Sequence, residues 1–131
     1  MTRCFTIFYR AAAVALVMTV APAVAQAQGT MPKGTQRTVT GTVVDVSCKF
    51  GQGLTGANHK MCAEVCADKG IPLAILGDDG KLYLATTAAM PGDGQNAKLR
   101  PFAEQKVTVT GKVFDAAGAS AIQIDRIVAA R

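Results

Sequence analysis

The chain has 131 residues, a formal net charge of +5, four cysteines, one histidine and no tryptophan. This length is enough for one domain and excludes a multidomain enzyme. Half of the residues are hydrophobic, which excludes a disordered chain, and a charge this modest does not by itself indicate nucleic-acid binding.

Residues 1–27 have the features of a bacterial secretory signal peptide. Arg3 and Arg10 supply a basic region, residues 11–20 are apolar, and small residues lead to a cleavage site at Ala27. The alternative is a retained membrane anchor, but the apolar run is about half of the ~20 residues that a span needs. We therefore expect a periplasmic or secreted protein with no membrane span after cleavage.

Cleavage would change the composition that matters for function. The charge would fall from +5 to +3, and Cys4 would leave with the signal peptide. Three cysteines would remain, Cys48, Cys62 and Cys66. A domain of about 100 residues can bury a core without disulfides, so a functional role for these cysteines becomes credible. The lower charge and the few aromatic residues argue against nucleic acid as a partner.

After a flexible polar segment at residues 28–36, the pattern predicts a mainly β domain over residues 37–131. Stretches of alternating or continuous apolar and β-branched residues indicate the strands. These strands are predicted at residues 37–47, 73–76, 81–86, 106–114 and 121–128. Residues 77–80 (GDDG) form the turn of a hairpin, and residues 88–101 are predicted to be a loop.

The first strand has an echo later in the chain. Residues 38–45 and 108–115 share the pattern T-V-T-G-x-V-x-D, so we expect both strands to bend at a glycine, Gly41 or Gly111. Five strands with glycine bends resemble an OB-fold, a five-stranded Greek-key barrel. One feature departs from that fold: its usual helix follows the third strand, whereas the clearest helix here follows the first.

That helix is predicted over residues 58–69 (NHKMCAEVCADK). Asn58 is expected to cap its start, and Gly70 with Pro72 to end it. His59, Cys62 and Cys66 would share one helical face, within an arc of roughly 60°. Cys48 is predicted at the end of the first strand, and the glycine-rich loop after it is flexible enough to bring all four side chains together.

Thiolates and imidazole are the ligands that zinc and copper prefer. Cys48, His59, Cys62 and Cys66 match a tetrahedral Cys₃His zinc site, and soft thiolates also suit Cu(I), to which Met61 or Met90 could add a thioether. The C-x3-C pair with a histidine resembles the ligand sets of copper-delivery proteins of cytochrome oxidase assembly and of the oxidase's binuclear copper centre. Those families place the histidine after the cysteine pair, so the likeness implies copper chemistry rather than ancestry.

The cysteine segment also resembles a group of small secreted bacterial proteins of little characterised function. These share a pattern near H-K-x-C-A-x-x-C-x-x-x-G-x-P, which starts here at His59 and ends at Pro72, followed by a hairpin and a V-x-V-T-G strand, residues 107–111. The resemblance implies a shared fold and cysteine site but no activity.

We therefore predict a metal-binding protein, for copper first and structural zinc second, with a periplasmic protein as a further partner. Two alternatives remain open. Cys48 could form a disulfide with Cys62 or Cys66, which would leave a non-enzymatic binding module. Cys62 and Cys66 could instead act as a thiol–disulfide redox pair, with His59 as proton acceptor. Nothing in the sequence requires catalysis.

Overall fold

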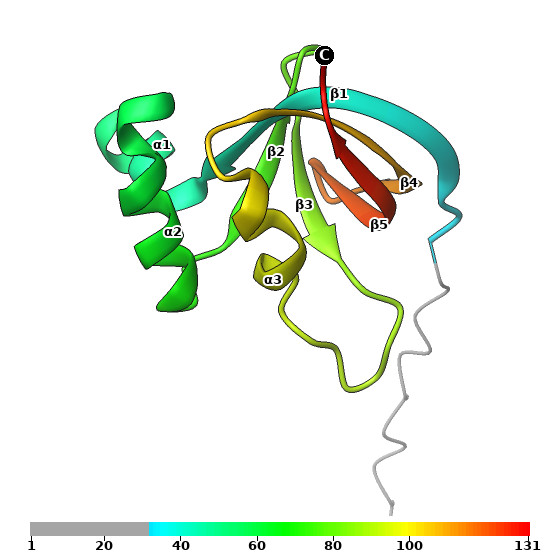
Figure 1. The fold of residues 1–131 in the computed structure, drawn as a ribbon. Helices are drawn as coiled ribbons and strands as arrows, with labels where there is room; N and C mark the ends of the chain where they lie inside the picture. Colours follow the sequence, from blue (N-terminus) through cyan, green and yellow to red (C-terminus); the bar gives the residue numbers. More distant parts are fainter. Residues whose placement is uncertain (1–31) are drawn as a thin grey trace, which may run out of the picture. The chain divides into compact units, whose positions relative to one another are not determined.

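A computed structural model describes residues 32–131, and the predicted signal peptide lies outside them. The described chain forms a closed barrel of five strands in the order β1-β2-β3-β5-β4 (Figure 1). The strands are β1 (Thr35–Asp45), β2 (Leu73–Gly77), β3 (Leu82–Thr86), β4 (Lys106–Ala116) and β5 (Ala119–Ala129). Within residues 32–131, no helix is long and apolar enough to cross a membrane.

The pairing of the strands explains how the barrel closes. β1 pairs with two neighbours, both antiparallel to it. Its first half pairs with β4 and its second half with β2. β3 and β5 run parallel, and the long β4–β5 hairpin completes the ring. The mainly β, five-stranded barrel with a short helix after the first strand is confirmed, and its strand order is compatible with the predicted OB-like architecture.

The first strand ends earlier than its alternating pattern predicts. β1 stops at Asp45, and helix α1 (Val46–Gln52) begins directly after it. Cys48 therefore lies in the first turn of a helix and not at a strand end. The reason is local, because the Asp45 side chain caps the helix and so ends the extended backbone.

The segment after β3 also differs from its prediction as a loop. It contains α3 (Asn96–Leu99) and the 3₁₀ helix η2 (Arg100–Phe102). Two tertiary interactions account for this. Leu99 is completely buried in the core. The side-chain amide of Asn96 donates to the carbonyls of Ala67 and Ile71, on either side of the turn before β2, and its oxygen accepts from the backbone N–H of Leu73. A short helix therefore does follow the third strand, as in the usual OB-fold.

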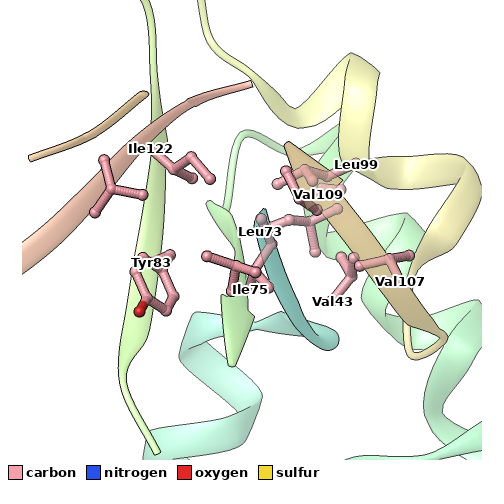
Figure 2. Close-up of a cluster of buried hydrophobic side chains, with 11 residues drawn as sticks. Val43, Leu73, Ile75, Tyr83, Leu99, Val107, Val109 and Ile122 are labelled. Atoms are coloured by element: carbon pink, nitrogen blue, oxygen red, sulfur yellow. The ribbon is translucent and has the colours of Figure 1, made fainter. Parts of the chain in front are cut away.

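The core fills the inside of the barrel with aliphatic side chains and one tyrosine. Figure 2 shows them converging from all five strands and from α3. The labelled residues are Val43, Leu73, Ile75, Tyr83, Leu99, Val107, Val109 and Ile122. The hydroxyl of Tyr83 leaves the core to donate a hydrogen bond to Asp79 in the predicted hairpin turn, at 2.5 Å, so no buried hydroxyl is left unpaired there.

The two echoed glycines lie where backbones approach too closely for a side chain. A Cβ at Gly41 would collide with the carbonyl of Leu76, and one at Gly111 with the carbonyl of Gln123. Gly111 also marks a register shift between β4 and β5. The echo in the sequence therefore reports a shared packing requirement of the closed barrel.

We expect Gly111→Ala to lower the free energy of unfolding by about 1–3 kcal/mol, because the carbonyl that its Cβ meets belongs to a rigid strand. Gly51 in α1 is the matched control, since a Cβ there meets no atom within 4 Å. Gly51→Ala should be neutral or stabilise by up to about 1 kcal/mol through helix propensity. Chemical denaturation of both variants measures the difference, and equal stabilities would contradict it.

Candidate metal centre

Helix α1 presents the first cysteine. Its start is fixed by Asp45, whose Oδ1 atom accepts a hydrogen bond from the backbone N–H of Cys48 at 2.9 Å. Its end is fixed by Gly53, which has a φ of 69° and donates to the carbonyls of Cys48 and Lys49. These two caps hold a helix of only seven residues and turn Cys48 toward the protein, where it is 7% exposed.

Helix α2 (Lys60–Asp68) presents the other two cysteines. It starts two residues later than predicted, because residues 57–59 form the 3₁₀ helix η1 (Ala57–His59), and no side chain caps either start. Its C-terminal end matches the prediction: Gly70 has a φ of 89°, and Ile71 donates back to Cys66 in a Schellman motif.

Small side chains let α2 approach the barrel closely. Ala63 and Ala67 are its buried residues, and Ala67 belongs to the barrel core. Arg100 holds the end of the helix through two hydrogen bonds to Asp68, at 2.6 and 2.9 Å. Figure 1 shows the result, with α1 and α2 side by side next to the end of β1.

The two helices bring three sulfur atoms together. The Sγ atoms of Cys48, Cys62 and Cys66 all lie within 4.8 Å of one another. Cys48 is buried, Cys66 is intermediate and Cys62 is exposed, so the cluster opens to solvent on one side. All three are free thiols; the alternative disulfide of Cys48 with Cys62 or Cys66 is not formed.

His59, the fourth predicted ligand, is not part of this cluster. Its Nδ1 atom lies 3.1 Å from Oε1 of Glu104, and both side chains are buried. The Nε2 atom on the other side of the ring is buried and has no hydrogen-bond partner among the described residues. The structure thus brings the three cysteines together and anchors the histidine to a different group.

Glu104 fastens the loop between α1 and α2 to the barrel. Its other oxygen, Oε2, accepts hydrogen bonds from Thr55 at 2.9 Å and from the Gly56 backbone at 2.7 Å. The backbone of Glu104 bonds Val43 in β1 at 2.8 Å, and its φ of 59° is unusual for a residue with a side chain. Glu104 therefore ties the loop between the two cysteine-bearing helices to β1.

Asp45 is a second acidic residue that the sequence did not identify as part of the site. It is completely buried. Its Oδ2 atom has no hydrogen-bond partner at ordinary distance within residues 32–131. The carboxylate interacts with the thiols of Cys66 and Cys48, which are weak hydrogen-bond donors.

These contacts shift the pKa values of the groups involved. Burial opposes ionisation of Asp45, but the hydrogen bonds from Cys48 and Cys66 outweigh it and lower the pKa of Asp45. The hydrogen bond to Asp45, followed by burial, raises the pKa of Cys66 to about 12. Burial and then the charge of Asp45 raise the pKa of Cys48. These two thiols are therefore protonated at neutral pH, the opposite of what a redox-active thiolate needs.

The sequence carried a signal for one of the two missed acids. Asp45 precedes Cys48 by three residues. This is the spacing between an N-cap residue and the residue whose backbone N–H donates a hydrogen bond to its side chain. Glu104 has no comparable local signal, because its partners are 45 to 49 residues away in the sequence.

Comparisons with protein-family models, curated proteins and solved structures found no match for the chain.

We expect Asp45→Asn to lower the pKa of Cys66 and to speed its alkylation at about pH 9. The substitution removes the negative charge that favours the protonated thiol, and the thiolate is the reacting form. Asparagine still caps helices well, so α1 should persist. Mass spectrometry of iodoacetamide-treated protein gives the rate at each cysteine, with exposed Cys62 as the internal reference. An unchanged ratio of Cys66 to Cys62 rates would contradict the expectation.

We expect Glu104→Gln to destabilise the protein by about 1–3 kcal/mol, because a neutral amide cannot accept all three hydrogen bonds and leaves a buried donor unpaired. Glu64→Gln is the matched control on the surface, since its ion pair with Lys60 is long, at 3.9 Å, and should cost no more than about 0.5 kcal/mol. Equilibrium unfolding in urea compares the two variants. Equal stabilities would show that Glu104 does not hold the loop.

Proposed function

We propose that the protein is an exported metal-binding protein that holds one thiolate-preferring metal ion through Cys48, Cys62 and Cys66. The observation that carries this proposal is the convergence of three free sulfur atoms within 4.8 Å. Export is the part of the proposal that comes from the sequence of residues 1–27 alone.

The arrangement of the thiols supports metal binding over the two thiol alternatives. A disulfide uses two cysteines and leaves the third without a role, whereas a metal ion uses all three. A redox pair needs a thiol with a lowered pKa, whereas the pKa values of Cys48 and Cys66 are raised. A bound cation reverses this preference, because it stabilises the thiolates and displaces their protons.

Copper(I) and zinc are the two ions that best fit a set of thiolates. Three sulfur atoms suit the soft Cu(I) ion, while zinc takes a fourth ligand. Met61 lies next to Cys62 in the sequence and Met90 is in a loop, but both side chains are largely exposed. We therefore base the proposal on the three cysteines and not on a thioether.

The exposure of the site on one side favours a protein that takes up and releases the ion over a protein in which the ion is buried and has only a structural role. Cys62 is exposed while Cys48 is buried, so an incoming ligand can reach the metal from the Cys62 side. The same two helices also carry exposed apolar side chains, Phe50 on α1 and Met61 and Val65 on α2. Such a surface is consistent with the expected protein partner.

We expect purified wild-type protein to bind about one copper or zinc ion per chain, and Cys66→Ser to lose it, because a serine hydroxyl is not a soft ligand. Val65→Ser is the matched control: the same residue is introduced on the same helix, at a half-exposed position next to Cys66, and the ion should be retained. Each variant is expressed as the full-length chain and purified, and its metal content and free thiols are then measured by elemental analysis and thiol counting.

Two results would overturn the proposal. One is wild-type protein that binds neither ion after reduction and reconstitution. The other is loss of the ion in Val65→Ser to the same extent as in Cys66→Ser, which would mean that binding depends on helix α2 being intact and not on the thiol.

A further inference from the structure

We propose that Asp45 supplies an oxygen ligand beside the three cysteines, which makes the centre a Cys₃Asp site for a divalent cation of the zinc class rather than for Cu(I). This inference rests on the proposed function, because it assumes that the three cysteines bind a metal ion.

The first observation is the unused oxygen of a buried carboxylate. Asp45 is 0% exposed, and only its Oδ1 atom is needed to cap α1. Serine or asparagine would cap the helix as well. The Oδ2 atom is buried without a hydrogen-bond partner at ordinary distance in the described chain. The thiols that interact with this carboxylate, those of Cys48 and Cys66, are weak donors, so a cation that displaced their protons would be a stronger partner for the unused oxygen.

The second observation is where the carboxylate lies. It interacts with the side chains of Cys48 on α1 and of Cys66 on α2, so it lies beside sulfur ligands from both helices. It is not within 4.8 Å of all three sulfur atoms. Cys62, the exposed member, is the ligand with the most freedom to close the remaining gap when an ion binds.

The charge of the ligand set favours a divalent ion. Three thiolates and one carboxylate carry four negative charges, and a divalent ion neutralises two of them while Cu(I) neutralises one. Because like charges repel strongly at buried positions, this difference favours the divalent ion. Carboxylate oxygen is also an ordinary ligand for zinc and a poor match for a soft monovalent ion.

His59 is the competing candidate for the fourth position. Its Nε2 atom is buried and unpartnered among residues 32–131, and a carboxylate on Nδ1 is the usual support of a metal-binding histidine. However, the contact with Glu104 accounts for the position of its ring, and Asp45, unlike His59, is among the groups that interact with the thiols of Cys48 and Cys66. We therefore assign the fourth position to Asp45 and use His59 as the comparison.

The test compares the full-length chain with Asp45→Asn and His59→Gln. Dissociation constants for Zn²⁺ and for Cu(I) are measured separately by competition with chromophoric chelators. We expect Asp45→Asn to weaken Zn²⁺ binding by about tenfold or more, the scale seen when groups at a metal site are removed. Cu(I) binding should be unchanged or tighter, and His59→Gln should leave Zn²⁺ binding near the wild-type value.

Three results would overturn the inference while leaving the proposed function intact. Asp45→Asn could bind Zn²⁺ as tightly as the wild type does. It could weaken Zn²⁺ and Cu(I) to the same degree, which would give Asp45 only the role of holding α1. His59→Gln could show the zinc-specific loss instead. Failure of the wild-type protein to bind either ion would contradict the proposed function itself, so the two failures are distinguishable.

Discussion

The carboxylate of Asp45 is the group on which the arrangement of the cysteines depends. One of its oxygens accepts a hydrogen bond from the backbone N–H of Cys48, and this hydrogen bond marks the end of β1 and the start of α1. The reversal from strand to helix turns Cys48 inward and places it opposite α2. The same carboxylate then interacts with the thiols and opposes their ionisation. A single acidic residue therefore sets both the geometry and the electrostatics of the cluster.

The connection between β3 and β4 holds the two helices against the barrel. Asn96 bonds the turn after α2, Arg100 pairs with the end of α2, and Glu104 fastens the loop before it. These three residues come from one short stretch of chain, so the same segment holds α2 at both of its ends. Because the clamp also contains the buried Leu99, it is part of the core and gives the cysteines a rigid support. Such preorganisation favours a defined coordination geometry.

The chemistry of the cluster follows from its surroundings. Burial and the nearby carboxylate of Asp45 raise the pKa values of Cys48 and Cys66, so these two thiols are disfavoured as nucleophiles. The same features suit a cation, which gathers the negative charges that otherwise repel one another. The gradient from buried Cys48 to exposed Cys62 would give a bound ion a protected side and an accessible side.

The sequence alone was enough to determine the strands, the hairpin turns and the C-terminal cap of α2, because these depend on alternation and on glycine at particular positions. It also predicted that Cys48, Cys62 and Cys66 would converge, since two of them share a helical face and a glycine-rich loop connects them to the third. The T-V-T-G echo correctly singled out Gly41 and Gly111, although only the closed barrel shows which carbonyls exclude a side chain there.

Only the tertiary structure decided which groups join the cysteines. His59 has the helical spacing of a ligand, but Glu104 holds its ring through a contact across 45 residues of sequence, which no local pattern reveals. The sequence pattern predicts that Asp45 lies at the end of a strand, as Asp115 does in the echoed segment. Yet Asp45 is buried beside the thiols, whereas Asp115 is exposed and accepts a hydrogen bond from Ser120. Local periodicity determines which way a side chain faces, while burial and long-range partners depend on how the whole barrel closes.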